Sequence, residues 1–211
     1  MSVNLGKMGA VLVSLVALSL AASSTAPAAQ FTAAKYPTTF SGTGSESNGA
    51  VKTKAGTAKC KKLSASATMS EASSTITVTG SASECTMFGF ATAHVLMNGC
   101  YSLLHVTEGS GDKYKGTGDL VCPAGKEIIA TPTSFGASVC SLRVFPQTGG
   151  VQIEFINDTV NGRVESKVLS LPGVYTSSGG PCGSAGEHSD GTLEQSVPAT
   201  SGGKEKTLVI S

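Results

Sequence analysis

The stretch from Cys85 to Cys122 constrains the fold more than any other part of the chain. It contains three of the six cysteines, two of the three histidines, the pair Asn98-Gly99 and the densest alternation of apolar with polar residues. A period of two is typical of strands, because successive side chains point to opposite faces. Asn-Gly between two such runs predicts a hairpin, since both residues tolerate the positive φ of a type I′ turn. We therefore expect antiparallel β-structure here.

The first 28 residues predict an export signal that is not part of the fold. Lys7 precedes an apolar run from Ala10 to Ala22, and small residues then lead to Ala26-Pro27-Ala28, as before a signal-peptidase cut. The run is shorter than the roughly 20 apolar residues that span a bilayer, and an uncleaved anchor is the alternative. We expect a signal helix at 1–28 and a single β-rich domain at 29–211. The alternative is a division of this domain into two subdomains with a boundary near 132–138. No membrane span is expected after cleavage.

The composition of the mature chain is neutral and rich in small polar residues. Removing Lys7 with the signal leaves 14 basic residues against 14 acidic ones. Without a basic stripe or an acidic tail, nucleic acid and anionic membranes are poor candidates for partners. The 26 glycines, the many serines and threonines and the absence of Trp favour strands and turns over helices.

All six cysteines follow the predicted signal, and an even number in an exported chain predicts three disulfides. The absence of Cys-x-x-Cys gives no support to a zinc knuckle or a thioredoxin-type redox site. Cysteines equidistant from a turn can face each other across a strand pair. This symmetry favours the pairs Cys60–Cys85, Cys100–Cys122 and Cys140–Cys182. The protein is expected to be secreted or extracellular, and association with the cell surface is a further alternative.

Further strands are expected on both sides of the central stretch. Asn48-Gly49 predicts a hairpin of 38–47 with 50–59, Asn98-Gly99 one of 91–97 with 100–107, and Asn161-Gly162 one of 151–156 with 163–170. Segments 61–69 and 75–83 form another pair, with Ile76 and Val78 on one buried face, and 192–197 pairs with 205–210. Residues 172–191 predict a loop held by Cys182. The fold class is therefore all-β, an antiparallel β-sandwich or barrel-like architecture built of consecutive hairpins and held by disulfides.

The chain resembles a family of small exported proteins from soil actinobacteria. The resemblance rests on Cys85-Thr86-Met87-Phe88-Gly89-Phe90, on Met97-Asn98-Gly99-Cys100-Tyr101 and on Val121-Cys122-Pro123-Ala124-Gly125-Lys126-Glu127-Ile128, and it covers most of the mature chain. It implies an exported, disulfide-bonded β protein and supplies no activity, ligand or catalytic residue. Where the family tends to have a small residue before Met97, this chain has His94.

Histidines are the first candidates for chemistry. His94 has the opposite parity to Val95 and is expected to face solvent. If its strand pairs with that of His105 across Asn98-Gly99, the two imidazoles lie diagonally and could share a metal with Glu84 or Glu108 as third ligand. This spacing matches no metal-binding signature, so we expect no metal and no cofactor. We interpret His188-Ser189-Asp190 as the polar tip of a loop, because three consecutive residues do not form the geometry of a catalytic triad.

Other chemistry has weaker support in the sequence. No Gly-x-Ser-x-Gly elbow occurs. Glycoside hydrolysis would need two carboxylates across a cleft, and the candidates would be Glu84, Glu154, Asp158 and Glu165. The aspartates do not follow calcium-loop spacing, and Asn157-Asp158-Thr159 matches a glycosylation sequon that arises often by chance.

The sequence favours a non-enzymatic exported β module with a structural or binding role at or outside the cell surface. Its partner would be an unknown extracellular ligand or envelope component. The alternatives are a secreted hydrolase that acts on an envelope or environmental polysaccharide, and a secreted inhibitor that presents residues 173–186 as a rigid, exposed loop.

Overall fold

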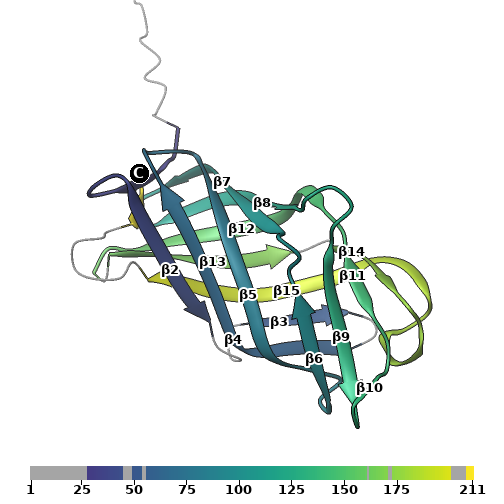
Figure 1. Cartoon of the computed structure of the whole chain (residues 1–211). Coiled ribbons are helices and arrows are strands. Elements are labelled where there is room, and N and C mark those ends of the chain that lie inside the picture. The colour runs from purple at the N-terminus through teal and green to yellow at the C-terminus, as the bar shows by residue number, and fades with distance from the viewer. Residues whose placement is uncertain (1–27, 45–48, 54–55, 161, 171–172, 201–207) are drawn as a thin grey trace, which may run out of the picture.

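The computed structural model describes residues 28–44, 49–53, 56–160, 162–170, 173–200 and 208–211, and Figure 1 shows its strands. The predicted signal at 1–28 lies outside this part of the chain except for Ala28. Within the described residues there are strands and one short 3-10 helix, and no α-helix. The elements are β1 (Phe31–Ala33), β2 (Thr38–Gly44), β3 (Gly49–Thr53), β4 (Gly56–Met69), β5 (Thr75–Met87), β6 (Ala91–Leu96), β7 (Tyr101–Ser110), β8 (Lys113–Val121), β9 (Ile128–Ser134), β10 (Ala137–Ser138), β11 (Leu142–Val144), β12 (Gln147–Asp158), β13 (Arg163–Ser170), β14 (Gly173–Ser177), η1 (Gly180–Cys182), β15 (Gly186–Thr200) and β16 (Leu208–Ile210).

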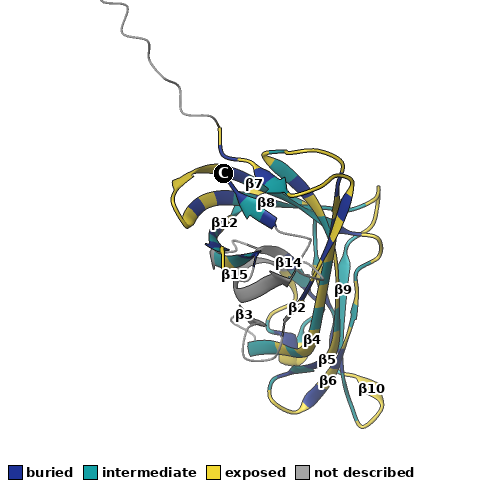
Figure 2. Cartoon of the chain, turned by 90° about the vertical axis from the view of Figure 1, so that its left-hand side faces the viewer, coloured by how far each residue is buried: buried dark blue, intermediate teal, exposed yellow. Residues whose placement is uncertain are grey.

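The predicted all-β class and the antiparallel pairing are confirmed. Three long strands, β4, β5 and β15, run the length of the molecule, and shorter strands lie end to end along their edges. Figure 1 shows β2, β4 and β5 in front, with β12, β13 and β15 crossing behind them. Figure 2, a quarter turn away, shows β12 and β15 on one side and β4 and β5 on the other.

Two of the three predicted Asn-Gly hairpins are wrong. The turn at Asn98-Gly99 forms, with φ of 50° and 80° and a hydrogen bond from the Cys100 amide to the Met97 carbonyl (2.8 Å). However, β6 and β7 do not pair with each other, because both lie along β5, β6 at its end and β7 at its beginning. Likewise, β2 and β3, on either side of residues 45–48, both pair with β4. The third hairpin, β12 with β13 around residue 161, is confirmed.

The β4–β5 hairpin extends beyond the predicted ends of its strands. Ile76 and Val78 share the inner face, as predicted. Farther along the hairpin, pairing continues from Lys62↔Ser83 to Cys60↔Cys85, and Glu84 between them has φ of 53°. Past this irregularity the inner positions change parity, so that Ala58 and Cys85 reach a second buried cluster. This change of parity interrupts the alternation near the point where the sequence pattern predicted strand ends.

Buried side chains form two clusters along the long strands. The first contains Phe31 and Phe155, whose ring centroids lie 5.3 Å apart in an edge-to-face arrangement, together with ten other buried residues. The second surrounds Cys85, Met87, Leu142 and Tyr175. Both clusters draw on residues before and after 132–138, the region proposed as a subdomain boundary.

The two ends of the described chain close one side of the first cluster. β1 pairs with β16, so the predicted hairpin of 192–197 with 205–210 is wrong. The 192–197 segment lies in β15, which pairs with β3 and β13. The buried side chain of Asn157 completes this arrangement: its Nδ2 donates to the Ile210 carbonyl (2.7 Å), and its Oδ1 accepts from the Ile210 amide (2.9 Å).

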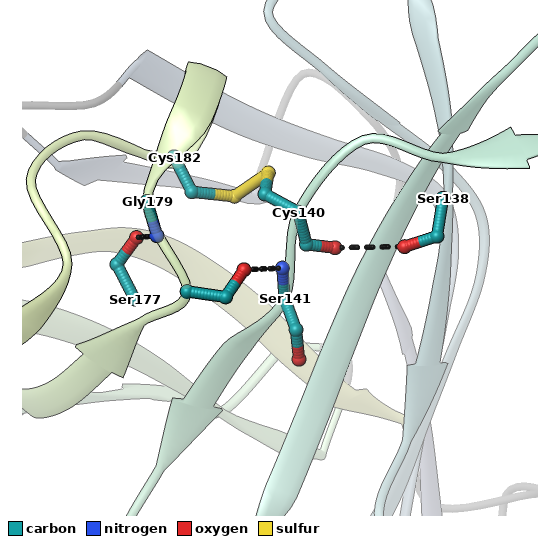
Figure 3. The surroundings of a disulfide bond; sticks show 7 residues. Ser138, Cys140, Ser141, Ser177, Gly179 and Cys182 are labelled. Carbon is teal, nitrogen blue, oxygen red and sulfur yellow. Dashed lines mark hydrogen bonds between the residues drawn. A yellow bond between two sulfur atoms is a disulfide. The ribbon is translucent and has the colours of Figure 1, made fainter.

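Three disulfides join Cys60 to Cys85, Cys100 to Cys122 and Cys140 to Cys182, the pairs that turn symmetry favours. Figure 3 shows how the third is surrounded by further bonds: the Ser141 amide donates to Ser178 Oγ (2.8 Å), and Ser138 Oγ donates to the Cys140 carbonyl (3.2 Å). The predicted loop at 172–191 is wrong in part. Because Val174, Tyr175 and Thr176 favour strand structure, this region includes β14 as well as the start of β15.

No helix in the described residues is long and apolar enough to cross a membrane.

Candidate functional site

His105 lies in a chain of polar side chains on the outward face of β5, β7 and β8. Its Nδ1 is 2.9 Å from Thr75 Oγ1, and its Nε2 is 3.0 Å from Asp119 Oδ2. The strand register explains this arrangement, because Thr75 is directly opposite His105 and Asp119 is diagonal to it, opposite Leu103. The neighbouring residues Ile76 and Val106 point the other way, into the first cluster.

The partners of His105 determine its tautomer. An ionised carboxylate can only accept, so Nε2 carries the proton that is donated to Asp119. In the neutral imidazole Nδ1 then accepts from the Thr75 hydroxyl. The hydroxyl, imidazole and carboxylate follow the order of a hydrolase triad. However, the Thr75 amide already donates to Ser73 Oγ (3.1 Å), so it does not serve as a donor to an oxyanion. The chain is best suited to fixing three strands to one another.

Asp119 also connects this chain to β12. The Gly149 amide donates to Asp119 Oδ1 (2.5 Å), at the bulge where β12 separates from β8. This hydrogen bond lowers the pKa of Asp119 below its usual value, and the contact with His105 acts in the same direction, against the opposing effect of desolvation.

We expect Asp119→Asn to lower the free energy of unfolding at pH 7 by about 1–2 kcal/mol, through loss of the charge-assisted hydrogen bonds. Because the folded-state pKa of Asp119 is lowered, its ionised form stabilises the fold above the unfolded value of about 3.9, and this stabilisation is lost as the pH falls through the folded pKa. Urea unfolding from pH 7 to pH 3 should therefore show the two proteins converging in acid. The exposed Asp112→Asn serves as control and should leave stability unchanged at pH 7. A difference for Asp119→Asn that stays constant with pH would contradict this role.

The structure does not bring the predicted histidines together. His94 is exposed on β6, as predicted, opposite Thr131 of β9. Its neighbour Ala93 pairs with Cys85 and His105 pairs with Thr75, so the two histidines lie about nine positions apart along β5, roughly 30 Å at the rise of a strand. The predicted strand pairing that would have made a shared metal site is therefore wrong. Among the described residues no group of three or more His, Cys, Asp or Glu side chains could hold a metal ion. His188 lies in β15 rather than at a loop tip, and its side chain is outside the described part.

The candidate carboxylates are mostly engaged in ion pairs. Glu84 is paired with Lys62, which lowers its pKa. Arg163 binds Asp158 (Nε to Oδ2, 2.8 Å) and Glu165 (Nη2 to Oε1, 2.9 Å). Glu154 lines a hollow of about 380 Å³ beside the β7–β8 turn, where Glu108 and Lys115 also lie.

The sequon at 157–159 has a structural explanation. Both polar atoms of the Asn157 side chain are bonded to Ile210, and the residue is 8% exposed. A buried amide in this position does not accept a glycan.

One part of the outward face of β2, β4 and β5 is rich in hydroxyl side chains. We define the hydroxyl array as the nine exposed residues Thr39, Ser41, Thr43, Ser64, Ser66, Thr68, Thr77, Thr79 and Ser81. Three cross-strand pairs are hydrogen-bonded: Thr39 with Thr68 at 3.1 Å, and both Ser64 with Ser81 and Ser66 with Thr79 at 2.8 Å. The segments 38–44, 63–69 and 75–83 that carry the array contain no charged residue.

The register makes this array regular. Thr39, Ser41 and Thr43 are directly opposite Thr68, Ser66 and Ser64. The rows through Ser66 and Ser64 continue into β5 at Thr79 and Ser81. Neighbouring strands in a sheet lie about 4.8 Å apart, and alternate residues on one strand lie about 6.7 Å apart. In the Thr39–Thr68 and Ser64–Ser81 pairs one hydroxyl donates to the other, and a second donor is retained. In the Ser66–Thr79 pair both donors are used, because Thr79 Oγ1 also donates to the Ser66 carbonyl (3.3 Å), but the hydroxyl oxygens retain lone pairs. The face can therefore both donate and accept at repeated positions.

Sequence reasoning missed the roles of Thr75, Asp119 and the array, although the alternation of hydroxyl with apolar or small residues at 64–68 and 75–79 is a signal for the array. The Thr75–His105–Asp119 chain depends on the pairing of β5 with β7, which no local pattern specifies. No known family model, curated protein or solved structure matches this chain.

Proposed function

We propose that the protein is an exported, non-enzymatic β module that binds an ordered, uncharged polysaccharide outside the cell through the hydroxyl array. The observation that supports this most is the composition of that part of the face: nine exposed positions on three adjacent strands carry Ser or Thr, within segments that contain no charged residue. Three disulfides agree with an oxidising environment.

The physical argument rests on many weak contacts. A single neutral hydrogen bond contributes about 1 kcal/mol net, since water competes for the same groups. Nine hydroxyls held in register can act together on a surface that itself repeats. Side chains already paired across strands, such as Ser66 and Thr79, lose little freedom on binding. The array is therefore suited to an extended polymer surface rather than to one small sugar.

Further parts of the proposal concern export and architecture. Export follows from the signal-like segment at 1–28, and it agrees with the resemblance to exported actinobacterial proteins. We propose a barrel-like rather than a sandwich arrangement, because β15 pairs with β13 on one side and with β2 on the other. A sandwich would be expected to leave its two sheets unpaired along such an edge.

A second candidate function is protease inhibition. The segment from Ser178 to Ala185 is held by Cys140–Cys182 and by the bond between the Ser178 amide and the Ser141 carbonyl (3.0 Å), while Gly180, Pro181 and Ser184 are exposed. An exposed segment with a fixed backbone is what an inhibitor presents. Assays of the oxidised protein against serine and cysteine proteases would test it.

The array is tested by retention on insoluble polysaccharides. The oxidised mature protein is mixed with crystalline cellulose, chitin or an insoluble β-1,3-glucan, all of them uncharged, and bound protein and released soluble sugar are measured together. We expect retention without release of sugar, and at least a tenfold loss of retention for the double variant Ser66→Lys/Thr79→Lys, because two buried ammonium groups would disrupt the contact.

The matched control is Thr107→Lys, an exposed hydroxyl residue on β7 outside the array. It should retain binding, and all variants should unfold cooperatively with similar midpoints. Release of sugar by the wild-type protein would favour the hydrolase alternative, with Glu108 and Glu154 in the hollow as the carboxylates to replace first. Absence of retention on all three polymers would overturn the proposal.

A further inference from the structure

Two neighbouring turns at one end of the molecule expose phenylalanine rings. We define the aromatic tip as Phe88, Phe90 and Phe135, from the β5–β6 and β9–β10 turns. Phe90 is 67% exposed and Phe135 fully exposed. The pairing of Thr92 with Thr133 brings the turns together, since Phe90 and Phe135 each lie two residues beyond that pair. Figure 1 shows β6 and β10 at the end of the molecule remote from the C-terminus.

The backbone of both turns is unusual for these side chains. Phe88 and Phe135 have φ of 59° and 50°, and each is followed by a glycine that also has positive φ. Asn or Gly normally occupies such a position, because a bulky residue is strained there. The Phe88 ring packs against Gly56, where an added Cβ would be 2.8 Å from it. Phe135 has no such compensation, since its ring is fully exposed. Strain together with an exposed apolar ring is more consistent with a binding role than with packing.

Positive charge accompanies the aromatic tip although the mature chain is neutral overall. The segment from Lys52 to Lys62 contains five lysines and no acidic residue. Residues 56–62 of this segment form the start of β4 beside the tip, where the Phe88 amide donates to the Thr57 carbonyl (3.2 Å). Lys59 and Lys61 are exposed on this strand, and Lys62 is paired with Glu84 of β5. The net charge of the chain does not show this local concentration of lysines.

We propose that the aromatic tip and the adjacent lysines dock the protein onto an anionic lipid bilayer. The rings of Phe90 and Phe135 enter the boundary between headgroups and acyl chains, a region that favours aromatic side chains. Lys59 and Lys61, a few residues farther from the tip, remain at the level of the lipid phosphates. Two rings on separate projecting turns suit a soft surface that they can penetrate. The tip and the hydroxyl array occupy different parts of the molecule, so this proposal does not depend on the polysaccharide.

Vesicle sedimentation tests the proposal with the oxidised mature protein. Vesicles of phosphatidylcholine with phosphatidylglycerol are compared with vesicles of phosphatidylcholine alone, at low and at high salt. We expect binding to the anionic vesicles that weakens with salt. The double variant Phe90→Ser/Phe135→Asn should bind at least tenfold more weakly, and Lys59→Glu/Lys61→Glu should lose the preference for anionic lipid. Asn suits the positive φ at 135, so the first variant should fold normally.

The control is Val160→Ser, which removes an apolar side chain that is 93% exposed in the β12–β13 turn. Its binding should equal that of the wild-type protein. Absence of binding to anionic vesicles, equal losses for Val160→Ser and the phenylalanine variant, or equal binding to both lipid compositions would each overturn the proposal. Loss of self-association in the phenylalanine variant, without vesicle binding by the wild-type protein, would assign the tip to a contact between copies of the chain instead.

Discussion

Asn157→Leu is expected to lower the free energy of unfolding by about 2–6 kcal/mol, since it leaves a buried amide and a buried carbonyl of Ile210 unsatisfied at about 1–3 kcal/mol each. Asn157 provides the hydrogen bonds of a strand neighbour to the backbone of Ile210, at 2.7 Å and 2.9 Å. Leu has a similar volume, so the effect isolates the loss of hydrogen bonds. The measurement is the midpoint and slope of urea unfolding for the oxidised protein.

Gln152→Leu is the matched control for this change. It makes the same exchange of an amide for an apolar side chain on β12, but at an exposed position. Exposed substitutions usually change stability by less than about 0.5 kcal/mol. Similar effects at the two positions would show that Asn157 does not hold β16 in place. A loss at Asn157 that exceeds what two unsatisfied groups account for would mean that Phe31, Leu208 and Ile210 also depend on Asn157 for their burial.

Local sequence signals predicted turns well and strand partners poorly. Asn98-Gly99 forms the expected turn, yet the chain then continues along β5 instead of returning on itself. Eight residues separate Ala93 from Ser102, whereas six separate their partners Val78 and Cys85, so the turn accommodates two extra residues in one long edge. Turn type is fixed by the φ that two residues tolerate. The partner of a strand is fixed by which apolar faces can be buried together, and this depends on the whole chain.

The candidate sites follow the same distinction. The alternation of apolar with polar residues was enough to predict the exposure of His94. The hydroxyl array corresponds to a similar local pattern, in which Ser or Thr alternates with apolar or small residues. The contacts of His105 required knowledge that residues 30 and 14 positions away lie beside it. The exposed phenylalanines carried no sequence signal, because an aromatic residue before glycine is compatible with both a core position and a turn. Their exposure and positive φ became visible only with the backbone.

Reduction of the three disulfides is expected to abolish cooperative unfolding at neutral pH. In the chain-entropy model, loops of 25, 22 and 42 residues correspond to about 3–4 kcal/mol each. Together they approach the typical total stability of a domain, about 5–15 kcal/mol. Near-UV circular dichroism and urea unfolding before and after reduction and alkylation would measure the effect. A reduced protein that still unfolds cooperatively with an unchanged midpoint would contradict it.

The three bonds should contribute unequally, and oxidised double-alanine variants separate them. Cys60–Cys85 also contacts the second cluster, but it connects two strands that are already paired on both sides of it, so its removal should have the smallest effect. Cys140–Cys182 closes the longest loop, and its residues are 6% and 1% exposed within the second cluster. Its removal takes away buried contacts as well as a chain constraint. The free energy of unfolding of Cys140→Ala/Cys182→Ala should therefore fall by at least about 3–4 kcal/mol, the value that the chain-entropy model gives for the loop alone. If Cys60→Ala/Cys85→Ala is instead the more destabilised variant, the second cluster does not depend on the connection between the β9–β11 region and η1.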